Sequence, residues 1–334
     1  MNKIKNLLKG SPIAMAVAGI LIAGIASAAI LAVYTTMVGT GKVEQSVVFG
    51  NGDTSKEYTI GHSPAIAGNT YTQEYNLLNR SETTAPIKFV TNQCIVGGGH
   101  CVDFDDSNFG YHEEGVETSY WSTVKLENKN VCPEGATSSD CWQPKTGDDI
   151  EATLTYELAA PTFNFEFEAT GLQSNEEYSL IYYADKQDRF TDWGGDNPGA
   201  LIATFKADEH GNIPKQTGSI NLKMNLPAPG DWNAVADPDY CDKHNGYDDY
   251  DLCRGAKIWL VPSDEYELST KKVKWTHPEK YLFETDLITY DDTDTDGEAL
   301  YLGKGMLNFF VKNVLAINLK PGEYKVKTEV QPVQ

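Results

Sequence analysis

Four acidic residues near the C-terminus have the spacing of a calcium-binding loop. Asp292, Asp294 and Asp296 alternate with threonines, and a glycine and Glu298 follow. Alternate carboxylates converge on one side of such a loop, and hard oxygen ligands suit Ca²⁺. The twelfth position is Gly303, where an EF-hand has a bidentate glutamate, and Glu298 is the expected substitute. The sequence predicts Ca²⁺ as a cofactor at these four acidic residues, with a solvated acidic loop as the alternative interpretation.

No other group of residues has the pattern of an enzyme site. The six histidines are scattered, and the HExxH motif of zinc enzymes does not occur. Residues 61–65 lack the final glycine of a nucleophile elbow, and residues 303–305 lack the upstream glycine of a phosphate-binding loop. The aspartates at 103–106, 188–196 and 248–251 are expected to lie in ordinary charged loops. We therefore expect that the protein is not an enzyme.

The cysteines and one sequon fit an exported chain. Each of three cysteine pairs brackets a loop rich in small or polar residues, and the spacings are not those of a zinc site. Six cysteines allow fifteen connectivities, so the sequence does not fix the pairing, and local disulfides are the economical interpretation. The only N-x-S/T sequon begins at Asn79, which is the candidate for glycosylation. The expected disulfides join Cys94 to Cys101, Cys132 to Cys141, and Cys241 to Cys253.

The N-terminus has the features of an export segment. Three lysines precede an apolar stretch over residues 13–33, and Ala26 and Ala28 supply the small side chains that signal peptidase requires. Three interpretations stay open: a removable signal peptide over residues 1–28, an uncleaved membrane anchor, and a prepilin cleaved after Gly10. All three place the rest of the protein outside the cytoplasm. We expect a secreted or cell-surface protein that contacts the membrane only through this segment before processing.

Composition and charge point to an all-β protein without a nucleic-acid partner. The chain has 334 residues and a formal net charge of −21, whereas nucleic acids and anionic membranes attract clustered lysine and arginine. Its Thr, Tyr, Val and Phe recur in short alternating runs, which favours strands. The length suits two β domains in addition to an export segment.

Alternating side chains predict two β-sandwiches. Residues 162–168 place three phenylalanines on one face, and Tyr71 and Tyr75 are also spaced for one face. Residues 324–330 alternate in the same way, and this terminal strand needs a sheet to join. We expect it to pair with the N-terminal half, so that an immunoglobulin-like sandwich is inserted into a jelly-roll or immunoglobulin-like one. The expected parts are residues 43–154 and 291–334 for the first sandwich and 155–290 for the inserted one.

Short segments at both ends of the mature chain resemble a known family. They read VEQSV at 43–47, PAIAGNTY at 64–71, NLLNR at 76–80 and AINLKPGEY at 316–324. These segments resemble the TasA/camelysin-like family of secreted, fibre-forming β-sandwich proteins, which includes archaeal subunits of bundling pili and extracellular tubes. Residues 155–285 depart from the single-domain pattern of that family.

The resemblance implies a filament subunit that donates its N-terminal segment, residues 29–42, to the sheet of the next copy. An added strand gains main-chain hydrogen bonds and buries alternate side chains, and a head-to-tail contact of this kind does not close on itself. The partner is then another copy of the chain, in a homopolymer. A flexible stalk is the alternative for this segment, and a secreted or cell-surface carbohydrate-binding module is the alternative function. The expected donor residues are Ile30, Leu31, Val33, Tyr34, Thr36 and Val38.

Overall fold

The computed structural model describes the greater part of the chain after residue 44. The described ranges are 45–81, 85–96, 115–131, 143–183, 201–223, 225–226, 256–293, 299–303 and 305–333. Met1–Gln45 and Ser46–Gln334 form two separate units of the chain. The expected signal peptide and donor segment therefore lie outside the described residues. Within the described ranges, no helix has the length and apolar character needed to span a lipid bilayer.

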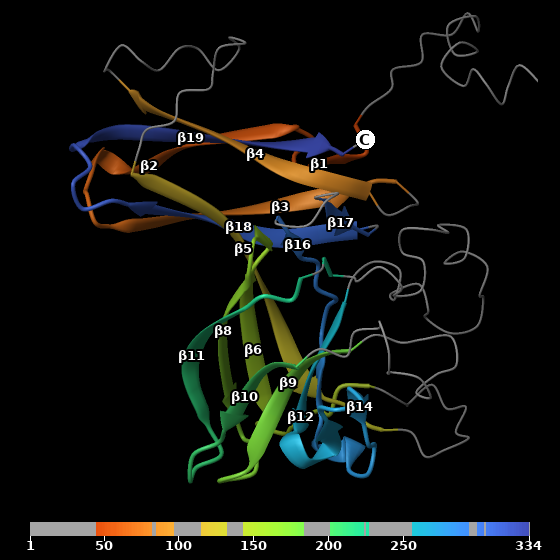
Figure 1. The fold of residues 1–334 in the computed structure, drawn as a ribbon. Helices are drawn as coiled ribbons and strands as arrows, with labels where there is room; N and C mark the ends of the chain where they lie inside the picture. The colour runs from red at the N-terminus through yellow and green to blue at the C-terminus, as the bar shows by residue number, and fades with distance from the viewer. Residues whose placement is uncertain are drawn as a thin grey trace, which may run out of the picture. The chain divides into compact units, whose positions relative to one another are not determined.

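The first sandwich combines strands from both ends of this unit (Figure 1). Its two sheets have the strand orders β1-β3-β18-β5 and β17-β4-β19-β2. The strands are β1 (Val47–Phe49), β2 (Ser55–Ala65), β3 (Thr70–Asn79), β4 (Ala85–Val96), β5 (Val116–Asn128), β17 (Leu300–Leu302), β18 (Gly305–Leu315) and β19 (Gly322–Pro332). The C-terminal strand β19 pairs with β2 and β4, as its alternation predicts.

The second sandwich is a curled sheet with the order β11-β8-β6-β5-β15-β12-β9-β10. Its own strands are β6 (Glu151–Glu157), β8 (Phe163–Thr170), β9 (Glu177–Tyr183), β10 (Leu201–Lys206), β11 (Ile213–Ile220), β12 (Lys257–Pro262) and β15 (Leu282–Glu284). Its two edge strands β10 and β11 are consecutive in the chain and are joined by a turn at residues 207–212. In that turn one carboxylate oxygen of Asp208 accepts hydrogen bonds from the backbone N–H groups of His210 and Asn212, both at 2.8 Å.

Short elements complete the described chain. Two of them form a hairpin, and one pair is the only parallel pairing among the described strands. They are β7 (Ala159–Ala160), β13 (Tyr266–Glu267), β14 (Lys272–Val273), β16 (Asp291–Asp292) and the 3-10 turns η1 (Ser263–Glu265) and η2 (Pro278–Lys280).

β5 belongs to both sandwiches. It pairs with β18 from Val116 to Trp121 and with β6 from Trp121 to Glu127. The change from one sandwich to the other therefore occurs within β5, at Trp121. The sequence placed that change at residues 154 and 155, which lie in the middle of β6. The two positions differ because β5 continues as one strand from Val116 to Asn128, so no turn in the sequence separates the two sheets.

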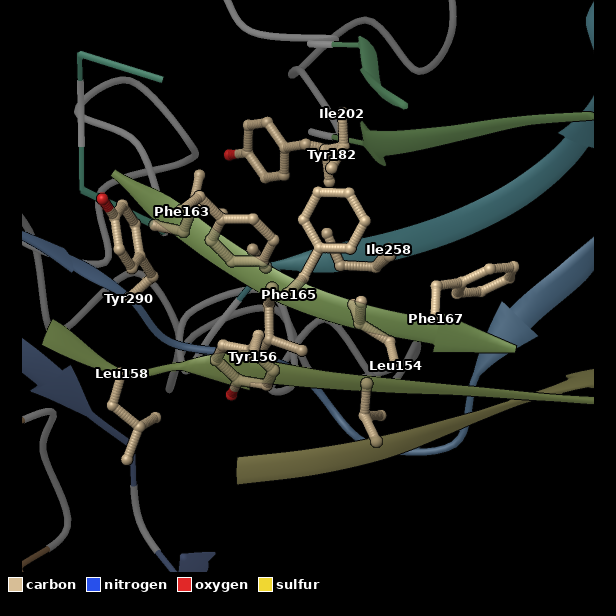
Figure 2. Close-up of a cluster of buried hydrophobic side chains, with 14 of the residues drawn as sticks. Leu154, Tyr156, Leu158, Phe163, Phe165, Phe167, Tyr182, Ile202, Ile258 and Tyr290 are labelled. Carbon is tan, nitrogen blue, oxygen red and sulfur yellow. The ribbon is translucent and has the colours of Figure 1, made fainter. Parts of the chain in front are cut away.

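The phenylalanines of β8 form the centre of the second core. Phe163, Phe165 and Phe167 are all buried on one face of the strand, as predicted (Figure 2). Gly218 of β11 lies opposite Phe165, and a Cβ atom at this position would overlap the phenyl ring. The ring of Phe165 can pack against β11 because Gly218 has no side chain.

The first core is also aromatic. Phe89 stacks on Tyr120 with ring centroids 4.2 Å apart, and Phe309 lies between the sheets, 5.2 Å from Phe89. Tyr75 packs on Phe309 at 5.8 Å, so this tyrosine faces the first core. Residues of the first and second cores form one continuous buried cluster. The two sandwiches are therefore joined by packing as well as by β5.

Candidate functional site

One edge of β3 is open over most of its length. β18 pairs with the whole of β3, from Thr70 to Asn79, whereas β1 pairs only with residues 77–79 on the other side. Among the strands that the structure describes, none pairs with that second side at residues 70–75. At ~3.3 Å per residue the open stretch is about 20 Å long. Such an edge can accept a further strand.

A tight turn ends β1 and so creates the open stretch. The turn predicted at residues 51–53 is present: Gly52 has a φ of 95°, and its N–H donates to the carbonyl of Phe49 at 2.7 Å. The N–H of Phe49 donates to the carbonyl of Asp53 at 2.8 Å, which turns the chain away from β3 into β2. A hydrogen bond from Lys56 holds the pKa of Asp53 below its usual value, and Asn51 adds to this effect. The sequence of the turn therefore fixes where the edge becomes open.

One hydrogen bond identifies which residues of β3 direct their main-chain N–H and C=O groups to the open side. The N–H of Gly50 donates to the carbonyl of Asn76 at 3.1 Å, on the same side as β1. The main-chain groups of alternate residues point to the same side of an antiparallel ladder, so those of Thr70, Thr72 and Glu74 also face the open side. The side chain of Gln73 donates to the carbonyl of Glu74 at 3.2 Å. One acceptor of the edge is thus covered by its own neighbour.

A pocket of about 620 Å³ opens where β1 turns away from β3. Its lining includes the aromatic residues Phe49, Tyr75 and Phe309 and the charged residues Lys56 and Glu74. Ring centroids of Phe49 and Tyr75 are 5.7 Å apart. The remaining lining residues are Gly50, Asn51, Asn76, Thr123, Asn308 and Phe310. The pocket can hold apolar side chains of a bound segment.

The hydroxyl group of Tyr75 is an unusual feature of this pocket. Its oxygen is buried and has no hydrogen-bond partner among the described residues. Burial raises the pKa of this tyrosine above its ordinary value. A buried polar group without a partner costs about 1–3 kcal/mol.

The structure describes only one of the four predicted calcium ligands. Asp292 is 1% exposed in β16, where it pairs with Ala160 of β7, and its N–H donates to the side chain of Asn225 at 2.7 Å. It is therefore a buried strand residue and not part of a solvated loop. Within the described residues, no group of three or more acidic, histidine or cysteine side chains has the arrangement of a metal site. Calcium binding stays a prediction, since Asp294, Asp296 and Glu298 lie outside the described residues.

Asn79 has a structural role that conflicts with glycosylation. Its side chain is buried, and its Nδ2 donates to the carbonyl of Leu302 at 2.9 Å. Its Oδ1 accepts from both the N–H and the hydroxyl of Ser81, at 3.0 and 2.7 Å. A glycan would be attached at Nδ2, which the folded protein encloses and uses. The sequon is recognised from the serine two residues after the asparagine, and it contains no information about whether the asparagine is buried.

The predicted disulfides and the alternative of a carbohydrate-binding module are tested less directly by the structure. Cys94 is buried in β4, and the other five cysteines lie outside the described residues. The three expected pairs therefore stay predictions. Trp259 is buried and stacks on Tyr183 with centroids 3.6 Å apart, so it is not an exposed platform for a sugar ring. Trp193 and Trp232 lie outside the described residues.

Sequence reasoning missed the open edge of β3 and the pocket beside it. The signal was the short apolar run Val47–Phe49 followed at once by a glycine-containing turn, opposite the longer strand Thr70–Asn79. A strand of three residues cannot cover a neighbour of ten. The register that places Tyr75 and Phe309 together depends on the pairing of β3 with β18, which the sequence does not state.

Comparison with known proteins identifies no relative of this chain. No protein-family model, no curated protein and no solved structure matches the chain. The resemblance to the TasA/camelysin-like family therefore stays an expectation based on short segments.

Proposed function

We propose that the protein is an exported structural subunit of an extracellular filament, pilus or tube. Residues 29–42 of one copy pair with the open edge of β3 in the next copy, and no catalytic activity is required. The observation that carries this proposal is the edge of β3, which is unpaired among the described strands at residues 70–75 and lies beside an aromatic pocket.

The composition of the donor segment suits this edge. Residues 29–38 are apolar or β-branched apart from Tyr34, and an added strand would bring alternate side chains to the pocket. Each aliphatic side chain that becomes fully buried contributes about 1.5–3 kcal/mol. The phenol of Tyr34 is the one aromatic group of the segment, and it can pack on the aromatic residues that line the pocket.

The position of Ser46 favours pairing between copies over pairing within one copy. The carbonyl of Ser46 accepts a hydrogen bond from the N–H of Arg80 at 2.9 Å, so the chain reaches β1 beside the C-terminal end of β3. The open residues 70–75 lie beyond β1. A segment that precedes Ser46 would have to reverse and pass both β1 and the turn at residues 50–53 to reach them. The edge of a neighbouring copy presents no such obstacle.

We also propose that Ca²⁺ stabilises the subunit through Asp292, Asp294, Asp296 and Glu298. The net charge of −21 supports a role for a divalent cation, because subunits of like charge repel each other unless the charge is screened or bound. The ligands alternate in the sequence as hard oxygen donors for Ca²⁺ do.

Electron microscopy of the purified mature protein tests the proposed function. We expect filaments from the complete mature chain and none from a variant that lacks residues 29–42. Samples with calcium and with a chelator show whether assembly depends on the cation. If both proteins stay monomeric in every sample, or if the deletion variant polymerises normally, the proposed function is wrong.

A further inference from the structure

Two exposed isoleucines lie together at one end of the first sandwich. Ile66 is 60% exposed in the turn between β2 and β3, and Ile317 is 88% exposed in the turn between β18 and β19. Two main-chain hydrogen bonds join these turns. The N–H of Gly68 donates to the carbonyl of Leu315 at 3.1 Å, and the N–H of Leu315 donates to the carbonyl of Asn69 at 3.0 Å. We call Ile66 and Ile317 the isoleucine pair.

The isoleucine pair lies at the end of β3 where the open edge begins. β3 starts at Thr70, directly after the turn that carries Ile66, and Thr70 pairs with Val314 of β18. At the opposite end of the edge, β1 pairs with residues 77–79, and Gly50 bonds to Asn76. An added strand therefore meets an obstacle at one end of the edge and the isoleucine pair at the other.

This asymmetry determines the direction of a donated strand, if the proposed function is correct. The C-terminal end of the donor segment continues into a folded neighbour, which needs space outside the sandwich. The turn at residues 50–53 closes the end near Asn76, so the continuing chain must leave past Thr70. The donor then runs from Asn76 towards Thr70, antiparallel to β3 and in the same direction as β1.

The length of the donor segment brings a particular part of it to the isoleucine pair. The open edge of about 20 Å takes about six extended residues. A strand that starts near Ile30 would pair along the edge to about residue 35, so that Thr36, Met37 and Val38 follow at the end of β3. Met37 and Val38 are apolar and match two exposed isoleucines.

We propose that the isoleucine pair is the surface over which the donor segment leaves the acceptor copy, and that Thr36–Val38 of the neighbouring copy covers it. This proposal rests on the proposed function and adds to it the strand direction and a second contact surface. Two apolar side chains on adjacent turns lose their exposure when the neighbour binds, and this burial favours assembly.

Photo-crosslinking within assembled filaments tests this contact. A photoreactive amino acid replaces Ile317 in the full chain, and it replaces Leu268 in the control, because Leu268 is 63% exposed on the second sandwich. Mixing copies of normal and heavy isotope composition identifies crosslinks between copies by mass spectrometry. We expect position 317 of one copy to join residues 34–42 of another, and the control position to give no such product.

Each other outcome has a definite meaning. If filaments form, require residues 29–42 and yet give no crosslink from position 317 to residues 34–42, the proposed contact and strand direction are wrong, while the proposed function stands. If neither filaments nor crosslinks form, both proposals fail.

A substitution experiment gives an independent measure. We expect the double variant Ile66→Ser, Ile317→Ser to need a roughly tenfold higher protein concentration for assembly, and Leu268→Ser to assemble like the parent. An unchanged assembly concentration of the double variant would count against the contact.

Discussion

The N–H of Gly50 donates to the carbonyl of Asn76 at 3.1 Å, and this is the last main-chain bond between the β1 segment and β3. Beyond it, the edge of β3 faces no other described strand. The bond therefore marks the boundary between the part of the edge that the chain covers itself and the part that we assign to a second copy.

The substitution Thr72→Pro should block assembly without unfolding the subunit. The N–H of Thr72 faces the open side of β3, so proline removes a donor that only an added strand would use. We expect electron microscopy to show no filaments, while the melting temperature of the monomer changes little. The control is Lys312→Pro, at the position that pairs with Thr72 in the central strand β18, where loss of the N–H should prevent folding. Filaments of normal yield from Thr72→Pro would show that this edge is not the acceptor.

The substitution Gly218→Ala should destabilise the second core. The added methyl group would overlap the ring of Phe165, and overpacking of this kind costs about 1–3 kcal/mol. The neighbouring exposed position provides the control Thr217→Ala, for which we expect a much smaller change. Urea unfolding followed by circular dichroism measures both. An unchanged midpoint for Gly218→Ala would mean that β11 moves away from β8 without cost.

Asn79 should carry no glycan, and its replacement by alanine should lower stability. The change would leave the carbonyl of Leu302 without its 2.9 Å partner, at a cost of about 1–3 kcal/mol. The intact mass of the exported protein checks for a glycan, and thermal unfolding checks the stability. Exposed Asn51→Ala serves as the control for loss of an asparagine at a turn. A glycan found at Asn79 in the folded, assembled protein would contradict the buried position.

Glu284 should make the protein less stable as the pH rises to neutrality. Burial raises the pKa of Glu284 to about 7, against the opposing charges of Lys257 and Lys129. Since the pKa in the folded state exceeds that in the unfolded state, the folded form binds the proton more tightly. Burying the ionised carboxylate lowers the free energy of unfolding. This loss is absent below about pH 4.5, grows as the pH rises, and is complete above about pH 7.

The variant Glu284→Gln isolates this effect because it stays neutral at every pH. We expect urea unfolding to show similar stability of parent and variant at pH 4.5, and a more stable variant at pH 8, by up to about 3 kcal/mol. The exposed Glu151→Gln is the control and should not change the pH dependence. A difference between parent and Glu284→Gln that is the same at both pH values would show that the titration of Glu284 is not its cause.

Calcium should raise the melting temperature through the acidic residues that follow β16. A ligand present at a hundred times its dissociation constant stabilises the folded state by about 2.7 kcal/mol. We expect a chelator to remove this increase, and the double substitution Asp294→Asn, Asp296→Asn to abolish it. The matched control is Asp103→Asn, Asp105→Asn in another acidic segment. An equal effect of calcium on both variants would indicate screening by the cation instead of a specific site.

The sequence predicts best what depends on neighbouring residues. The alternation around Phe163, Phe165 and Phe167, the turn at residues 51–53 and the terminal strand β19 all follow from local pattern, and the structure has each of them. The all-β class follows from the same signals.

Features that depend on pairing between distant residues were not predictable. The burial of Asp292 follows from its pairing beside Ala160, although its charge indicates exposure. The open edge of β3 arises from the register of β1 and β18 on its two sides, which lie more than two hundred residues apart in the chain. No local pattern contains that register.

The pairing of β3 with β18 also has a consequence for the timing of the proposed export. A chain that crosses a membrane from its N-terminus delivers β3 early and residues 305–315 nearly last. Until β18 arrives, β3 lacks the partner that it has along its whole length, and no acceptor edge exists. An incomplete chain would therefore carry the proposed donor segment but could not receive one. In the proposed filament, growth at the acceptor end would therefore wait until almost the entire subunit has been translocated.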